Sequence, residues 1–415
     1  MNHKKGLNAI IVLALSCACL LLNSCMQSSD SLLSRVKINV PFEDSVLNFA
    51  KVEIEKFLGE AETNSKADQN NWIINFVVDT NMASYSFSVN SQTKGNKQVV
   101  DLSGSNSTCV LHAAYTMLEK AGYQFEISGP AFPHELQMKN LINWSETVRP
   151  VVLKRGIRQH INFPMDISSY AQEEAKEYIH NLARLRFNSI VFHSYPNQWV
   201  EGPQAGTNKF AGAYFYGQRH DIPQDTLVSN HIRNKKTYCI PEIEAYIDQP
   251  EECSKRSVEW LNAVRAECKK AGMFIQFSFE PRDTALNVTG TLNTCEAILK
   301  SYPLIDNLEI ISQETGKWSG QNATAKEIQA IVEKHFDKNI FSENSSISNF
   351  QNSADPSLVS SNKQAFVDRD YLRLLAELGH NVKATKELLA QKKHEGLKIN
   401  LGVYCVVPEY LKACL

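Results

Sequence analysis

The carboxylate of Glu314 follows a short apolar run and could therefore act in acid–base chemistry. Leu308, Ile310 and Ile311 form the apolar run, and the sequence then becomes polar through Ser-Gln-Glu-Thr-Gly at 312–316. In an α/β barrel, polar residues that follow a strand lie at the C-terminal rim, where catalytic groups are placed. The pattern indicates a catalytic acid. The alternative is a strand end whose carboxylate is solvated or pairs with a lysine.

Further carboxylates follow other predicted strands. Glu280 and Asp283 come at the end of a strand predicted at 274–280, and Glu409 follows one predicted at 398–404. Glycoside hydrolysis generally uses two carboxyl groups that flank the scissile bond, one as acid and the other as nucleophile or base. We therefore take Glu314 as the candidate acid and Glu280 as the other candidate catalytic residue.

Side chains that could bind a sugar follow the first two predicted barrel strands. His160 ends the strand predicted at 155–160, and His193 ends the one at 188–193. The segment 196–253 is rich in aromatic and polar residues, and its candidates are Trp199, Tyr216, Arg219 and His220. Aromatic rings stack on the C–H faces of sugars, and polar groups bind their hydroxyls. The alternatives are a structural flap for the segment and a structural role for each lone histidine.

Elements that would position these residues alternate from about residue 150 onward. Strands are predicted near residues 155, 188, 274, 305 and 398, with helices at 169–185, 258–271, 292–302, 326–336, 366–378 and 384–391. This alternation is typical of a (β/α) barrel of the TIM type, which needs eight strands to close. The chain reaches only five, so the predicted barrel over 150–415 is incomplete at its C-terminus. A truncated reading frame is favoured over three missed strands.

Residues 36–145 predict a small α/β domain. Strands are expected at 36–40, 72–78, 84–89, 98–103 and 123–127, and helices at 44–58 and 108–121. Residues 104–107 (Gly-Ser-Asn-Ser) are expected to form a turn into the second helix, which carries Leu111, Ala114, Tyr115, Leu118 and Glu119 before Gly122 and Tyr123. This run resembles the domain that precedes the barrel in family 20 β-hexosaminidases and family 67 α-glucuronidases. The segment 155–160 (Arg-Gly-Ile-Arg-Gln-His) resembles the start of their first barrel strand.

The resemblance implies a glycoside hydrolase whose substrate site lies in the barrel. Family 20 enzymes carry an Asp-Glu pair where this chain has Gln313 and Glu314. Their substrate-assisted mechanism relies on that pair, so the resemblance to α-glucuronidases survives better. The base of those enzymes lies on later strands, which this chain does not contain.

Residues 1–25 predict an export signal, and 26–35 a polar tether. Lys4 and Lys5 precede an apolar stretch that ends in Leu-Asn-Ser-Cys, with Cys25 last. This ending resembles a bacterial lipobox, whose cysteine is lipidated. We expect a lipid-anchored protein of the bacterial cell envelope. The alternative is an ordinary cleaved signal with a chance cysteine.

Composition excludes several other function classes. The formal net charge of −2 argues against a general nucleic-acid binder. The ten cysteines include no C-x-x-C pair, so neither a zinc site nor another metal or cofactor is predicted, and no disulfide pairing or oligomeric state can be assigned. P-loop, G-x-G-x-x-G and G-x-S-x-G patterns are also missing. The sequence thus predicts an exported, α-glucuronidase-like glycoside hydrolase acting on oligo- or polysaccharide. The alternative is a non-catalytic carbohydrate-binding lipoprotein or an inactive truncated remnant.

Overall fold

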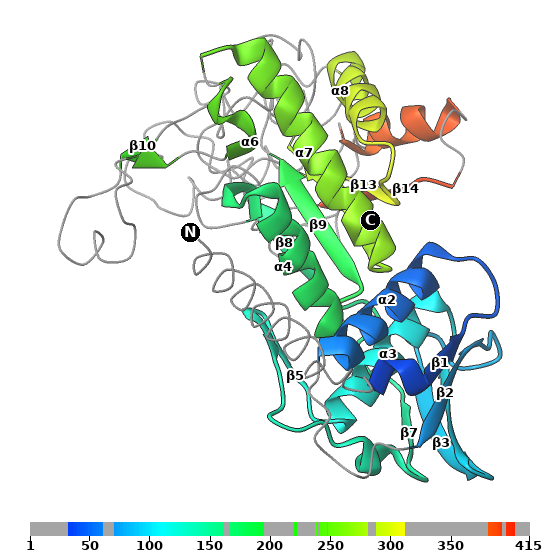
Figure 1. The fold of residues 1–415 in the computed structure, drawn as a ribbon. Coiled ribbons are helices and arrows are strands. Elements are labelled where there is room, and N and C mark those ends of the chain that lie inside the picture. Colours follow the sequence, from blue (N-terminus) through cyan, green and yellow to red (C-terminus); the bar gives the residue numbers. More distant parts are fainter. Residues whose placement is uncertain are drawn as a thin grey trace, which may run out of the picture. The chain divides into compact units, whose positions relative to one another are not determined.

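The computed structural model describes ten stretches of the chain, namely residues 32–60, 70–160, 167–194, 220–221, 237–238, 241–246, 248–280, 288–311, 381–391 and 396–402. They fall into two compact units (Figure 1). The first comprises Met1–Glu126 and Pro130–Leu153, and the second comprises Ile127–Gly129 and Lys154–Leu415. Each unit is built around one five-stranded sheet.

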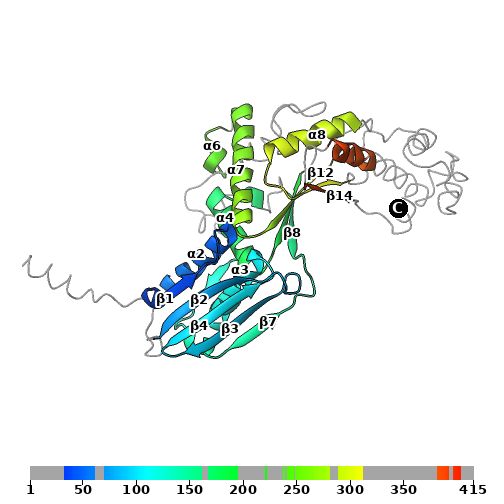
Figure 2. The ribbon, with the colours of Figure 1, turned by 90° about the vertical axis from the view of Figure 1, so that its right-hand side faces the viewer.

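The sheet of the first unit is mixed, and Figure 2 shows its strands side by side. In spatial order the strands are β1 (Val36–Asn39), β2 (Asn71–Val78), β4 (Lys97–Gly104), β3 (Phe87–Lys94) and β7 (Ser145–Val148). The pairs β1–β2 and β2–β4 are parallel, whereas β3 runs antiparallel to both β4 and β7. Two helices, α2 (Ser45–Glu60) and α3 (Ser107–Lys120), pack against each other and lie on one side of the sheet (Figure 1).

The core of the first unit follows from the two-residue period of its strands. Trp72, Ile74 and Phe76 point to the helix-covered face of β2 and are nearly or fully buried, while the residues between them are more exposed. Each buried large apolar side chain contributes about 1.5–3 kcal/mol through removal from water. Tyr115 of α3 is also fully buried, and its hydroxyl donates to the buried carboxylate of Glu53.

The tight turn predicted at 104–107 is confirmed, and its glycine has a steric reason. Asn106 caps α3, because its side-chain oxygen accepts a hydrogen bond from the Cys109 backbone N–H. A Cβ on Gly104 would lie 2.5 Å from the Val110 backbone nitrogen. Only glycine therefore allows the strand to pass so close to the helix that follows it.

Two strand predictions in the first unit were wrong in detail, and one strand was missed. The strand predicted at 84–89 begins only at Phe87, because Tyr85 has a φ of 60° and the Ser86 N–H bonds to the Ala83 carbonyl in a turn. The strand expected at 123–127 is the short β5 (Gln124–Glu126), which pairs with β6 (Gly129–Ala131) outside the main sheet. The last strand of that sheet is β7, whose polar sequence has no apolar alternation.

The second unit contains a wholly parallel sheet. In spatial order its strands are β14 (Lys398–Gly402), β13 (Asn307–Ile311), β12 (Phe274–Phe279), β9 (Ser189–Ser194) and β8 (Gly156–His160). Spatial order equals chain order, as in the first part of a (β/α) barrel. The five predicted strands are thus confirmed, and β8 and β14 form the edges of the sheet within the described residues.

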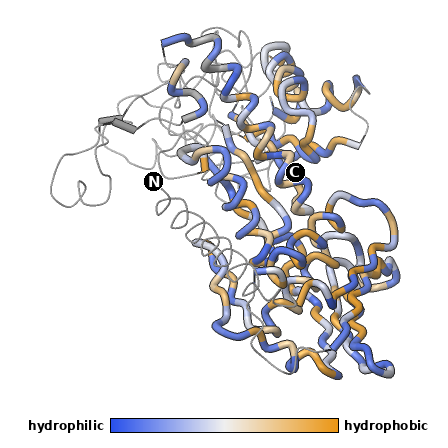
Figure 3. Tube along the Cα trace, viewed as in Figure 1, coloured by the Kyte–Doolittle hydropathy of each residue, from blue (hydrophilic) through white to orange (hydrophobic). Residues whose placement is uncertain are grey.

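Helices cover one face of this sheet. They are α4 (Gln172–Arg184), α7 (Pro250–Lys270) and α8 (Val288–Ser301), and residues 381–390 are also helical. In Figure 3 the colour along α4 and α7 alternates between hydrophilic and hydrophobic, as expected of helices with one apolar face. The apolar face of the sheet is formed by Ile190, Phe192, Ile275 and Phe277, all fully buried.

Helix α7 begins eight residues before the predicted start at residue 258. Pro250 occupies its first turn, where proline is tolerated because the N–H it lacks would have no partner inside the helix. The first two turns are polar and show no apolar periodicity, and Arg256 stabilises them by ion pairs with Glu252 and Glu259. Smaller elements of this unit are η4 (Ile167–Ser169), β10 (His220–Asp221), β11 (Thr237–Tyr238) and α6 (Pro241–Glu244).

Within the ten described stretches, membrane-spanning helices and clusters of metal-binding side chains are absent. None of their helices combines the length and apolar character needed to cross a bilayer. None of their His, Cys, Asp and Glu side chains gather in threes or more around a possible metal position. Cys268 and Cys295 are fully buried free thiols, and burial raises the pKa of both. They behave as small apolar core residues.

Candidate functional site

The face of the parallel sheet opposite the apolar one carries polar side chains. One row of register partners crosses all five strands and contains His160, His193, Ser278, Glu309 and Asn400. Register partners of a parallel sheet point to the same side, so the row forms one continuous polar strip. We call this strip the polar row.

Polar side chains also lie two residues before and two residues after the polar row along the strands. On the amino side, Gln276 accepts hydrogen bonds from the side-chain amides of Asn307 and Asn400, at 2.6 and 3.3 Å. On the carboxyl side, the backbone N–H of Glu280 donates to the Ser194 carbonyl at 3.3 Å. Strand pairing thus continues to Glu280, which places its side chain on the same face as Ser278.

Arg158 links the polar row across the width of the sheet. Its Nη2 donates to Glu309 Oε2 at 2.5 Å, and its Nη1 donates to Ser278 Oγ at 3.1 Å. Arg158 lies on β8 and Glu309 on β13, with β9 and β12 between them. On a flat sheet these strands would be three spacings apart, roughly 14 Å. A direct ion pair is explained by a sheet that curls toward this face, as the wall of a barrel does.

His193 stands at the centre of this network. Its Nδ1 lies 3.0 Å from Ser278 Oγ and 3.4 Å from Arg158 Nη1. Because Ser278 Oγ accepts from Arg158, its own hydroxyl proton is available for Nδ1. The network therefore assigns the remaining imidazole proton to Nε2, which lies 3.5 Å from Glu280 Oε1. The result is a chain of groups from Arg158 through Ser278 and His193 toward Glu280.

Electrostatics keep this imidazole uncharged. Burial, followed by the positive charge of Arg158, lowers the pKa of His193 to about 4, while Glu309 acts in the opposite direction. The His193 side chain is 0% exposed and that of Glu280 is 5% exposed. At neutral pH, Glu280 thus has a neutral N–H donor beside it in largely dry surroundings. Carboxyl groups of this kind suit acid–base or nucleophilic work.

Three of the predicted site residues come together at this edge of the sheet. The rings of His160 and His193 lie 4.9 Å apart, and His193 adjoins Glu280. His220 begins the short strand β10, which pairs with β11. The remaining candidates, with the proposed lipidation site and two further carboxylates, lie outside the described residues: Glu314, Trp199, Tyr216, Arg219, Cys25, Asp283 and Glu409.

Sequence reasoning missed Arg158, Ser278 and Glu309. A signal for them exists, because Arg158 and Ser278 each lie two positions before a predicted rim residue, His160 and Glu280. Residues two apart on a strand share a face. Glu309 is a charged residue between the apolar residues Leu308 and Ile310 of a strand, which itself points to a buried partner.

Comparison with known proteins finds distant structural similarity to glycoside hydrolases. The sequence matches no protein-family profile and no curated protein. A GH138 enzyme targeting pectin rhamnogalacturonan II aligns at 16% identity and a TM-score of 0.39, over 67% of this chain and 30% of its own. The GH20 exo-β-N-acetylglucosaminidase of Vibrio harveyi, in an inactive mutant form, aligns at 13% identity and a TM-score of 0.42. The alignment covers 91% of this chain and 55% of that enzyme. The GH20 β-N-acetylhexosaminidase of Streptomyces coelicolor aligns at 9% identity and a TM-score of 0.43. This alignment covers 91% of this chain and 68% of that enzyme. The chain thus spans about a third and about half of the first two structures.

Proposed function

We propose that this protein is an exported glycoside hydrolase that cleaves oligo- or polysaccharides by general acid–base catalysis. The observation that carries the proposal is Glu280, a buried carboxyl group at the C-terminal end of β12, with the neutral imidazole of His193 3.5 Å away. The C-terminal end of the strands is where barrel enzymes place their reactive groups.

Cleavage of a glycosidic bond needs a proton on the departing oxygen and a negative group near the positive charge that develops on the sugar. Glu280 is proposed for the second task, because its carboxyl group follows β12 directly and lies 3.5 Å from the His193 imidazole. Glu314 is proposed as the acid. It comes three residues after the end of β13, which pairs directly with β12. The two carboxyl groups would then flank one bond from adjacent strands.

Substrate binding is proposed for the groups around this edge of the sheet. His160 adjoins His193 and could donate to or accept from a sugar hydroxyl. The segment after β9 would supply Trp199 and Tyr216 for stacking and Arg219 and His220 for hydroxyl or carboxylate binding. A carboxylate-bearing sugar, as an α-glucuronidase would bind, is the finer form of the proposal.

Export and anchoring belong to the same proposal. The motif that ends in Cys25 supports lipidation and attachment to the cell envelope. Cys25→Ser is expected to release the mature protein from the membrane fraction, and unchanged membrane association would contradict the lipoprotein proposal.

The decisive experiment is hydrolysis of a panel of aryl glycosides and uronate-containing oligosaccharides by the full chain. Glu280→Gln and Glu314→Gln are each expected to lower the rate about a hundredfold or more, the usual scale for losing a catalytic carboxyl group. The matched control is Glu259→Gln, which removes the same charge from a side chain of α7 that is 50% exposed. Full activity of Glu280→Gln would overturn the assignment.

A non-catalytic carbohydrate-binding protein is the second candidate. It is favoured by the engagement of the described carboxylates with protein groups, since Glu309 pairs with Arg158 and Glu280 faces His193. Wild-type protein that binds oligosaccharides but hydrolyses no member of the panel would establish this candidate in place of the enzyme.

A further inference from the structure

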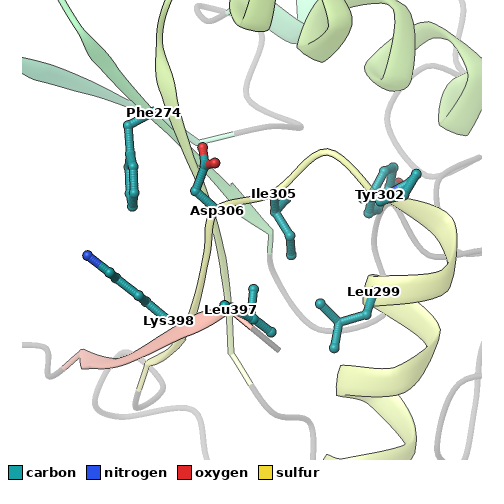
Figure 4. Close-up of a pocket in the computed structure, with 9 residues that line it drawn as sticks. Phe274, Leu299, Tyr302, Ile305, Asp306, Leu397 and Lys398 are labelled. Atoms are coloured by element: carbon teal, nitrogen blue, oxygen red, sulfur yellow. The ribbon is translucent and has the colours of Figure 1, made fainter. Parts of the chain in front are cut away.

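A hollow of about 600 Å³ lies at the opposite end of the parallel sheet from Glu280. Phe274 and Lys398, the first residues of β12 and β14, line it (Figure 4). Six residues of extended chain separate Phe274 from Glu280, which corresponds to about 20 Å. The hollow is therefore distinct from the candidate catalytic site, and its volume is that of an ordinary small-molecule site.

Positive charge is in excess at one end of the hollow. The two carboxylate oxygens of Asp306 accept hydrogen bonds from Lys269 Nζ, each at 2.5 Å, and Oδ2 also accepts the Ile275 backbone N–H at 2.7 Å. Asp306 is thereby engaged in joining α7, β12 and β13. No salt bridge involves Lys154 or Lys398 within the part of the chain that the structure describes. Lys269 thus already neutralises Asp306, and Lys154 and Lys398 add further positive charge at this end.

Lys154 lies against Phe274, which lines this end of the hollow, and Lys398 lines the hollow directly. Lys154 Nζ lies 3.8 Å from the centre of the Phe274 ring, a cation–π contact. Burial and then the charge of Lys398 lower the pKa of Lys154, and the charges of Asp306 and Glu309 oppose this to a smaller extent. A bound anion between the two ammonium groups would remove this repulsion.

The other end of the hollow is apolar. Figure 4 shows Leu299 and Tyr302 at that end, with Ile305 and Leu397 between them and the charged end. Tyr302 is fully buried, and its ring stacks on Phe277 at a centroid distance of 5.0 Å, so this wall is held by the core of the unit. A ligand that fits the whole hollow would combine a negative group with a ring or other apolar part.

We propose that this hollow binds a small ring compound that carries an oxyanion, either a carboxylate or a phosphate, with the oxyanion between Lys154 and Lys398 and the ring against Leu299 and Ile305. A uronic acid and a sugar phosphate share this chemistry. The proposal does not depend on hydrolysis at the carboxyl end of the sheet.

Titration calorimetry of the full chain with three probes tests the proposal. D-glucuronate represents the carboxylate source, glucose 6-phosphate the phosphate source, and glucose the neutral ring. At least one of the two anions is expected to bind about tenfold or more tightly than glucose, with an affinity that falls as salt is added. The anion that binds more tightly identifies the source.

Variants of the lysines locate the binding. Lys398→Met and Lys154→Met are each expected to weaken anion binding about tenfold or more, while Lys398→Arg, which keeps the charge, retains most of it. Lys255→Met is the matched control, because it removes the same charge from an exposed side chain near the start of α7. The stability of each variant is checked by its thermal unfolding.

Three results would each overturn the proposed site. Glucose binds as tightly as both anions, or neither anion binds at about 10 mM. The third is that Lys255→Met weakens anion binding as much as the two other lysine-to-methionine variants. Activity on glycosides is measured in parallel. Loss of anion binding with unchanged hydrolysis separates this site from the proposed catalytic one, and each can fail independently.

Discussion

The two sheets of this protein each have one polar face, and the two faces are built differently. On the mixed sheet, Asn39 Nδ2 donates to Asn75 Oδ1 at 2.8 Å, and Asn75 Nδ2 donates to Asp101 Oδ1 at 2.7 Å. These residues are direct register partners on adjacent strands. On the parallel sheet, Arg158 passes over two intervening strands to reach Glu309. The first face joins neighbouring strands, whereas the second also joins distant strands.

The difference separates a stabilising arrangement from one suited to chemistry. Amide ladders between partly exposed neighbours need no desolvated charge and contribute modestly to stability. The polar row instead places charged or titratable groups in largely buried positions, which is costly unless each is paired. Apolar residues at these positions would stabilise the fold equally well. Such groups are therefore expected where a substrate is bound, and three predictions test the contrast.

The largest effect is expected for the pH dependence of stability through His193. Its folded pKa of about 4 lies below the ordinary value of 6.5, so the unfolded chain takes up a proton first as the pH falls. The folded state should lose about 3 kcal/mol between pH 7 and pH 4, because a shift of one pKa unit corresponds to about 1.4 kcal/mol. Urea unfolding at several pH values measures this loss.

His193→Gln should remove this component of the pH dependence, and His134→Gln, at an exposed position of the first unit, should leave it unchanged. If the wild type and His193→Gln lose stability in parallel between pH 6.5 and pH 4, the buried neutral histidine is contradicted.

A smaller effect is expected from removing one charge on each polar face. Glu309→Gln leaves Arg158, whose side chain is 31% exposed, without its counter-ion, and should lower the free energy of unfolding by about 1.5–3 kcal/mol. Asp101→Asn removes the same charge but keeps the oxygen that accepts from Asn75, so a loss below about 0.5 kcal/mol is expected. Equal losses in the two variants would show that the faces do not differ in kind.

The smallest effect is expected from cutting the amide ladder itself. Asn75→Ala deletes both ladder bonds from a partly exposed position and should cost about 1 kcal/mol, with no change in hydrolysis or in sugar binding. Urea unfolding and the glycoside panel measure the two quantities. A loss of activity in this variant would contradict the view that the polar face of the mixed sheet only stabilises the protein.

Local chemistry in the sequence was sufficient for much of the fold. The short apolar run from Ile190 to Phe192 predicted a strand, and the small residues from Gly104 to Ser107 predicted a turn, because these signals act over a few residues. The order of the five parallel strands followed from the rule that successive strands joined by helices become neighbours. The first two turns of α7 and the whole of β7 were missed, because these polar segments carry no apolar period.

The candidate site was decided by both sequence and tertiary structure. Strand ends alone brought His160, His193 and Glu280 to one edge, since parallel strands finish together. Arg158 reaches Glu309, 151 positions away, because the sheet curls. His193 is neutral because the folded protein buries it. The hollow beside Phe274 likewise combines residues from α8, β12 and β14. Curvature, burial and cavities arise from packing between distant segments, and no local pattern in a sequence encodes them.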